Sequence, residues 1–292
     1  MKIGSEAHKD LFCQSFMDSH LLYEPETLAW PELDSAMIER LQRIPFWDEA
    51  LYTERKAGVM LKAYAETVED PQIRVAIALQ AAEEARHGRV IGYMINHYGI
   101  QVAERAEKPL PENLEPAFVK FGYGECFDSF FAFGLFGIAR QGGFIPDALF
   151  TIFNTLVDEE ARHMVFFVNW IAHKQIVEGR GALRPFSSLQ QYTGAAFRRL
   201  DNLMGMGKGE KKSANKKGFT AAGAKAVKVD LTLESFLEMC IAENDKRMQA
   251  YPEELLRPDF LPAIASLAFN TAKLLPKRKP NQPVGKELEA RG

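Results

Sequence analysis

The pattern of apolar and polar residues along this 292-residue chain predicts helices almost throughout. No stretch sustains the strict alternation of apolar and polar positions that a half-buried strand needs. Strong helix formers dominate from about residue 45 to residue 97. They are interrupted once, at Asp70-Pro71, where a turn is followed by a proline at the first position of the next helix. This stretch therefore predicts an antiparallel pair of helices.

A second pair of helices is predicted from about residue 117 to residue 177. Its turn is indicated by Gly142, Gly143 and Pro146. Between the two pairs, residues 99–116 contain three prolines and predict a connection instead of a core element. Such a segment could extend over about 60 Å, which is enough to cross the full length of a helical bundle.

The remainder of the chain predicts further helices and two basic segments. The further helices are expected at about 183–204, 232–250 and 261–275. A Lys- and Gly-rich insertion at about 205–229 is expected to be mobile, and residues 276–292 are a basic, proline-containing tail. We therefore expect a single all-α domain over residues 1–292, with a core bundle at about 45–175.

Composition points to a large buried core and away from several partners. With 47% hydrophobic and 26% charged residues, the chain is expected to fold. Its net charge of -3 gives no strong field for nucleic acid or an anionic membrane. The most apolar run, FFAFGLFGIA, is far shorter than the roughly 20 residues of a spanning helix, so no integral membrane segment is predicted. Cys13, Cys126 and Cys240 contain no CxxC pair, which predicts neither a disulfide framework nor a zinc site and favours the cytoplasm.

One short motif stands out because the sequence Glu-Glu-Ala-Arg-His occurs twice, 76 residues apart. On a helix, residues three apart lie on the same face, one turn from each other. Glu84 and His87 can therefore hold one ion, and so can Glu160 and His163. Carboxylate and imidazole together suit a transition metal with oxygen chemistry.

The spacing of other acidic residues adds a carboxylate from each partner helix. In an antiparallel pair, residues equidistant from the turn lie at the same height, and the midpoint of Glu54 and Glu84 is position 69, inside the first turn. The midpoint of Glu125 and Glu160 falls between positions 142 and 143, inside the second turn. Asp128, one turn beyond Glu125, would shift that midpoint only to 144, so it stays open as the alternative ligand.

The resulting order, Glu, Glu-x-x-His, Glu, Glu-x-x-His, resembles the ferritin-like non-haem di-iron carboxylate proteins over about residues 45–175. The resemblance implies a ferritin-like four-helix bundle with additional helices, holding two iron ions, with Mn/Fe as the alternative metal content. The implied ligands are Glu54, Glu84, His87, Glu125, Glu160 and His163. A competing interpretation is that each motif is a solvated helical face with glutamate–arginine ion pairs.

The resemblance also implies a layer of residues around the ligands. Glu83 and Glu159 stand where relatives often carry an acidic residue that accepts a hydrogen bond from the histidine of the opposite motif. Arg86 and Arg162, three residues further on, are the alternative partners of these carboxylates. Asp128, if it is not a ligand, is expected to lie beside the metal ligands.

The resemblance further implies an oxygenase or oxidase of the N-oxygenase-like branch. The helices outside the bundle and the segment 21–41 could enclose a cavity, which favours a small organic substrate, oxidised with dioxygen and an external electron donor. The alternative is metal handling by a ferroxidase, a peroxidase or a Mn/Fe-binding protein. A non-catalytic helical module would require an empty site, and a homodimer is left open.

Three other features have a chemical and an ordinary interpretation. Ser129, one turn after Glu125, stands where bacterial multicomponent monooxygenases carry a threonine beside the dioxygen site, or it bonds its own backbone. Gly134 and Gly137, among phenylalanines, could leave room for a substrate or allow helices to pack closely. Glu243 could add a metal ligand or pair with the basic residues that follow it.

Overall fold

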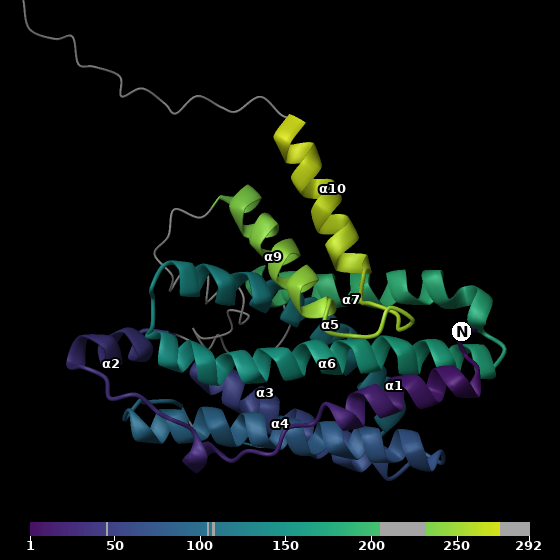
Figure 1. Cartoon of the computed structure of the whole chain (residues 1–292), viewed down its shortest axis with the longest axis horizontal. Helices are drawn as coiled ribbons and strands as arrows, with labels where there is room; N and C mark the ends of the chain where they lie inside the picture. The colour runs from purple at the N-terminus through teal and green to yellow at the C-terminus, as the bar shows by residue number, and fades with distance from the viewer. Residues whose placement is uncertain (45, 104, 107–108, 205–231, 275–292) are drawn as a thin grey trace, which may run out of the picture.

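The fold is known from a computed structural model that describes residues 1–44, 46–103, 105–106, 109–204 and 232–274. Every regular element within these residues is a helix (Figure 1), which confirms the all-α class. The predicted insertion at 205–229 and the predicted tail at 276–292 lie outside the described residues.

Two long helices form the first antiparallel pair, α3 (Trp47–Ala65) and α4 (Pro71–His97). The side chain of Asp70 caps α4, because its Oδ1 accepts hydrogen bonds from the backbone N–H groups of Gln72 and Ile73 at 3.0 and 3.1 Å. The two helices pack closely at Gly58, where a Cβ would lie 3.1 Å from a backbone atom of α4. The turn and the close contact together fix the register of α3 along α4.

The second antiparallel pair consists of α5 (Leu114–Gln141) and α6 (Asp147–Val177). Gly143 occupies the turn with a φ of 57°, a left-handed conformation that glycine adopts without strain. The pairs join because α5 also packs against α3, and α6 also packs against α4. The four helices therefore enclose one shared interior.

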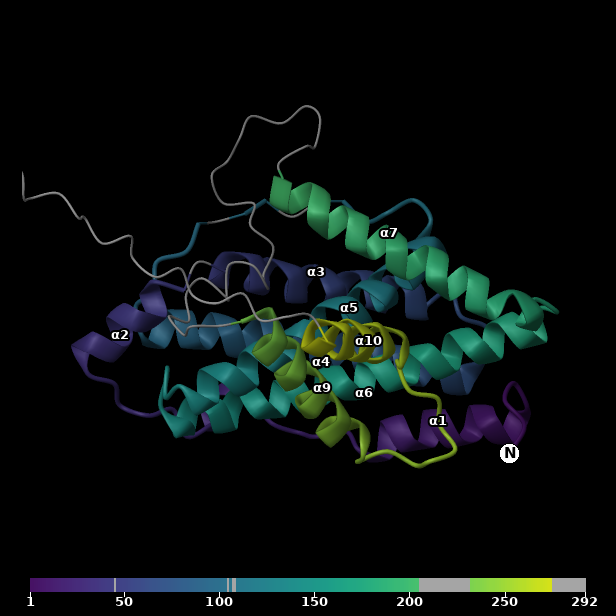
Figure 2. The ribbon, with the colours of Figure 1, turned by 90° about the horizontal axis from the view of Figure 1, so that it is seen from above.

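Further helices cover this set of four from two sides. Before it come α1 (Glu6–Asp18), the short η1 (Pro25–Thr27) and α2 (Ser35–Gln42), and after it η2 (Gly181–Leu183), α7 (Arg184–Met204), α9 (Leu233–Met248) and α10 (Phe260–Leu274). The last three α-helices occupy the segments predicted as further helices, whereas α1 was not predicted. Helix α1 packs on α4 and α6, while α7 and α9 pack on α5. Figure 1 shows α10 projecting from the body of the molecule next to α9, and Figure 2, seen from above, shows both helices in front of the middle of the body.

The hydrophobic core is divided into two clusters by a belt of buried polar residues. One cluster includes Phe12 and Phe16 of α1, which contact Phe166 of α6 with ring centroids 5.6 and 4.8 Å apart. The other lies around the amino-terminal part of α6 and the carboxy-terminal part of α4. On α4 the first cluster ends at Ala81 and the second begins at Val90. The first copy of the motif therefore lies between the clusters, and the second lies at their boundary on α6, where the second cluster ends at Leu156 and the first includes Ala161.

The small residues of α5 serve helix packing. A Cβ at Gly134 would lie 2.3 Å from Sγ and 3.0 Å from the backbone nitrogen of Cys240 on α9, and one at Gly137 would lie 2.7 Å from Sδ of Met239. The expectation that these glycines leave room for a substrate is therefore wrong, because α9 fills the space beside them.

Two other expectations concern the chain as a whole. Across the described residues, no helix has the length and apolarity needed to cross a membrane. Cys13, Cys126 and Cys240 are free thiols, and all three are buried.

The close contact at Gly134 predicts a stability difference between two glycine substitutions. Gly134→Ala should destabilise the protein by about 1–3 kcal/mol, because the new methyl group meets the backbone of α9. Gly92→Ala, on α4, places its Cβ at least 3.6 Å from its neighbours and should be neutral or stabilise by about 0.5–1 kcal/mol through helix propensity. Chemical denaturation of the two full-length variants measures the difference, and equal effects would contradict the packing argument.

Candidate metal centre

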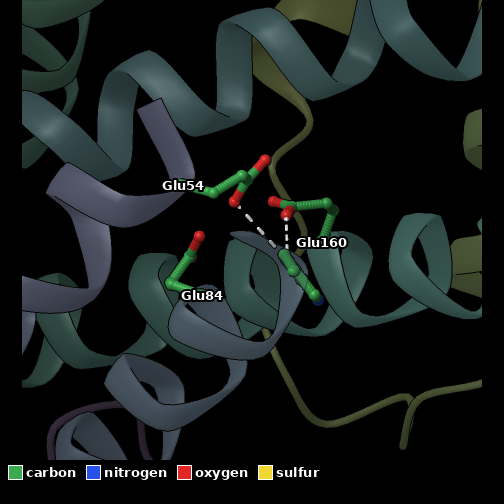
Figure 3. A group of neighbouring side chains, drawn as sticks. Glu54, Glu84 and Glu160 are labelled. Carbon is green, nitrogen blue, oxygen red and sulfur yellow. Dashed lines mark ion pairs between the residues drawn. The ribbon is translucent and has the colours of Figure 1, made fainter. Parts of the chain in front are cut away.

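Six side chains from four helices converge in the interior. Two groups have ligand atoms that all lie within 4.8 Å of one another. The first group is Glu54, Glu84, His87 and Glu160, and the second is Glu84, Glu125, Glu160 and His163. Figure 3 shows the carboxylates of Glu54, Glu84 and Glu160 directed toward one another from α3, α4 and α6.

The two groups overlap, because both contain Glu84 and Glu160. Each group has one imidazole of its own, His87 or His163, and one terminal carboxylate of its own. This arrangement has the composition of two adjacent cation sites that share two bridging carboxylates, which is the pattern of dinuclear sites in helical bundles. A solvated helical face does not account for it, since Glu84 and both imidazoles are at most 1% exposed.

The atoms that face the middle of this centre have no hydrogen-bond partner in the described part of the chain. They are both carboxylate oxygens of Glu84, Oε2 of Glu125, Oε2 of Glu160 and Nδ1 of His87 and His163. Nδ1 of His163 lies 3.0 Å from Oε1 of Glu84, and Nδ1 of His87 lies 3.1 Å from Oε1 of Glu160, without forming hydrogen bonds. Unpaired buried polar atoms are costly, and a cation bound among them would satisfy them. The mixed oxygen and nitrogen donors suit iron or manganese.

The carboxylates at the two ends of the centre hold protons in the metal-free protein. Burial, together with the charges of Glu84 and Glu160, raises the pKa of Glu54 to about 8. Burial and the same two carboxylates raise the pKa of Glu125 well above its usual value. Although burial opposes the change, the neighbouring imidazoles of His163 and His87 lower the pKa of Glu160. Although burial opposes the change, the surrounding carboxylates also raise the pKa values of His87 and His163 well above their usual range, so metal binding has to release protons from imidazoles as well as from carboxylates.

Each histidine is oriented through its other ring nitrogen by the opposite motif. Nε2 of His87 lies 2.8 Å from Oε2 of Glu159, and Nε2 of His163 lies 2.8 Å from Oε2 of Glu83. Although burial opposes the change, the hydrogen bond to His163 and nearby positive charges lower the pKa of Glu83 to about 2, so it stays an acceptor. Because Nε2 of each ring is hydrogen-bonded, Nδ1 of each ring is directed at the carboxylates of the two ligand groups.

The two arginines also pair across the motifs. Nη2 of Arg86 lies 2.6 Å from Oε1 of Glu159, and Arg162 forms a close ion pair with Glu83. Within each motif the corresponding distances are longer, 4.0 Å for Arg86 and 3.7 Å for Arg162. The intrahelical pairing considered from the sequence is therefore the weaker contact, and the cross-motif pair is the stronger one.

Two residues of this outer layer were missed by the sequence analysis, and both come from the segment between α1 and η1. His20 forms a hydrogen bond with Glu83, and the hydroxyl of Tyr23 donates to Oε2 of Glu159 at 2.8 Å. Burial and the charge of Glu159 raise the pKa of Tyr23 to about 12, so this hydroxyl keeps its proton. The guanidinium of Arg86 lies 4.2 Å from the centroid of the Tyr23 ring. A histidine and a tyrosine in a segment without a motif gave no sequence signal for these contacts.

The centre is closed on one side and partly open on another. The histidine side is covered by the segment that carries His20 and Tyr23. On the carboxylate side, the side chains of Glu54 and Glu160 are 21% and 18% exposed. The carboxylates of Glu54 and Glu160 are therefore less completely buried than the two imidazoles.

The remaining sequence candidates lie outside the two groups. The carboxylate of Asp128 is 44% exposed and accepts a hydrogen bond from Nε of Arg199 at 2.9 Å, which draws it toward α7, so Glu125 and not Asp128 lies in one of the two groups. Ser129 is buried one turn from Glu125, and among the described residues its hydroxyl makes no hydrogen bond to the backbone of α5. Glu243 lies 3.3 Å from Arg247, the ion pair that its sequence context indicated.

Comparison of the chain with protein-family models, with curated proteins and with solved structures finds no match.

The overlapping groups predict that the protein binds about two transition-metal ions per chain, as dinuclear helical-bundle sites do. His87→Ala and His163→Ala should each lower the metal content sharply, because each imidazole is the only nitrogen donor of its group. Elemental analysis after loading with Fe(II) or Co(II) measures this. His97→Ala is the control, since His97 is exposed at the end of α4. Full occupancy by two ions in the double variant would contradict the assignment.

The positions of Glu125 and Asp128 predict opposite results for two substitutions on α5. Glu125→Ala should remove one terminal carboxylate and lower the affinity of the centre for one of the two metal ions. Asp128→Asn should leave the metal content near that of the unmodified protein, because its carboxylate is held by Arg199. Titration of both variants with Co(II), followed by visible absorption, separates the two residues. A larger loss in Asp128→Asn would transfer the ligand role to Asp128.

Proposed function

We propose that this chain is a ferritin-like four-helix-bundle protein that holds two iron ions and uses dioxygen to oxidise a small organic substrate. The observation that supports the proposal best is the pair of overlapping groups that share Glu84 and Glu160. Helices α3, α4, α5 and α6 would be the four helices of the bundle, since each contributes ligands and packs on two of the others. The same donors also suit a Mn/Fe pair.

The charge of the centre fits two divalent ions. Four carboxylates carry four negative charges when ionised, which matches the charge of two divalent cations and leaves the buried centre near neutrality. Bound iron would supply the electrons that dioxygen needs for its reduction. Carboxylates bind in one- and two-oxygen modes, so Glu84 and Glu160 can adjust as the charge at the centre changes.

The outer layer would keep this geometry fixed during turnover. Glu83 and Glu159 hold Nε2 of the two imidazoles, and the Arg86 and Arg162 guanidinium groups balance these carboxylates. Tyr23 covers Glu159 and excludes water from that side. The imidazoles therefore keep one tautomer and one orientation.

Oxidation of an organic molecule is favoured over iron storage by the surroundings of the centre. The ring centroid of Phe16 lies 6.0 Å from that of His163, and Phe16 belongs to the apolar cluster that also contains the buried Phe130 and Phe133 of α5. The additional helices α1 and α9 close the bundle behind α6 and α5. An apolar enclosure protects a strong oxidant from water. Ser129, one turn from Glu125 on α5, would offer a hydroxyl beside that carboxylate. Insertion of one oxygen atom of dioxygen into the substrate, with the other released as water, would take two electrons from an external donor and two protons.

The reaction class can be tested by loading the metal-free protein with Fe(II) without oxygen and then mixing it with dioxygen in a stopped-flow spectrometer. We expect a transient visible absorption whose decay is faster when an aryl amine substrate is present. The oxygen in the product should carry the label of ¹⁸O₂. We expect this because an apolar enclosure would keep water away from the oxidised centre until a substrate binds.

The control for this experiment is Asp128→Asn, whose substitution lies outside the two ligand groups and should leave the transient in place. Rapid formation of ferric mineral, with no transient and no labelled product, would contradict the oxygenase proposal. It would instead support ferroxidase or metal-handling chemistry at the same centre.

A further inference from the structure

A pocket separate from the metal centre lies between α3 and the segment that follows α4. Its volume is about 500 Å³, within the range of sites that enclose a small organic molecule. The apolar part of its wall is formed by Leu51, Val59, Met60, Val102 and Leu110. This pocket is called the α3 pocket below.

Part of the wall of the α3 pocket lies on the side of α3 opposite to Glu54. Tyr52 and Lys56 line it, and each is two residues from the metal-site residue Glu54. At about 100° per residue, two residues along a helix correspond to about 160–200° around its axis. Tyr52 and Lys56 therefore lie across α3 from Glu54, whereas Leu51, three residues before Glu54, lies on the same face of the helix as Glu54.

Positive charge dominates the charged part of the wall. The charged lining residues are Asp48, Arg55, Lys56 and Arg105. Asp48, the one acid among the described lining residues, is already bound by Nη2 of Arg105 at 2.9 Å. Arg55 and Lys56 are exposed and form no ion pair with any described residue. Within the described part of the chain, these two cations at the pocket therefore have no acidic partner.

More positive charge gathers next to Lys56 at the junction of α3, α5 and α7. Burial and the charges of Arg198, Lys56 and Arg199 lower the pKa of Lys120 on α5, which places these cations within electrostatic reach of one another. Arg199 is bound by Asp128, but Nε and Nη2 of Arg198 have no hydrogen-bond partner in the described part of the chain. The field at this end of the pocket is therefore positive.

We propose that the α3 pocket binds a small apolar molecule that carries one carboxylate or phosphate group, with the anion held by Arg55 and Lys56. The apolar wall takes the hydrocarbon part, and the anion meets the two uncompensated cations. The positive charges of Lys120 and Arg198 favour the same orientation. A peptide or a nucleic acid is a poor match, because a pocket of this volume encloses a drug-sized ligand and little more.

The test uses isothermal titration of the full-length protein with decanoate, decyl phosphate and uncharged decanol. We expect one of the two anions to bind at least about fivefold more tightly than decanol, which corresponds to about 1 kcal/mol for a partly exposed charge pair. The ranking of decanoate and decyl phosphate identifies the anionic group. Lys56→Gln should remove most of this preference, and Val59→Trp should weaken all three ligands by filling the pocket.

Two controls keep the result specific. Lys62→Gln removes an equivalent exposed charge from α3 outside the pocket and should change nothing. His163→Ala, which impairs the proposed metal centre, should leave the affinity for the anion intact. Equal binding of decanol and both anions would overturn the proposal, and so would an equal effect of Lys56→Gln and Lys62→Gln. Loss of anion binding in His163→Ala would also overturn it, by placing the ligand at the metals.

Discussion

The structure depends on one constraint, which is the burial of a charged belt inside an otherwise apolar helical core. Ionised side chains in a protein interior are tolerated only when they are paired and hydrogen-bonded. Here the pairing runs between the two motifs: His87 with Glu159, and His163 with Glu83. Since each motif supplies the partner of the other, α4 and α6 can bury their polar faces only against each other and only in one register. The belt therefore fixes the packing of the two helices as firmly as the apolar clusters on either side of it.

The same constraint explains why the amino-terminal segment belongs to the core. Glu83 and Glu159 each have two oxygens, and one histidine satisfies only one hydrogen-bonding direction. The arginines of the opposite motif form ion pairs with these carboxylates, and His20 and Tyr23 supply their remaining hydrogen bonds. The apolar contacts of Phe12 and Phe16 with Phe166 hold α1 in place for this purpose. Without that segment, the two carboxylates would face solvent on the histidine side of the centre.

The sequence predicts those parts of this arrangement that rest on local spacing. The i, i+3 motif and the turn midpoints are enough to bring Glu54, Glu84, Glu125 and Glu160 to one height, because antiparallel helices joined by short turns have little freedom of register. The choice between Glu125 and Asp128 was beyond that reasoning, since it depends on Arg199, which approaches from α7. The role of Gly134 was likewise decided by Cys240 of α9, a contact between residues more than one hundred positions apart. His20 and Tyr23 were missed for the same reason, because no local pattern reports a partner that lies across the fold.

The imidazole side and the carboxylate side of the candidate centre differ in burial and in rigidity. Both imidazoles are buried and their Nε2 atoms are hydrogen-bonded, so a molecule could reach a bound metal ion past them only by breaking the pairs between α4 and α6. Glu54 and Glu160 keep about a fifth of their side-chain surface exposed. Carboxylates can change their binding mode at low cost, whereas an imidazole has a single donor atom to offer. The rigid imidazole side of the candidate centre is thus the side that contributes to the packing of α4 and α6, and the more adaptable carboxylates lie on the less buried side.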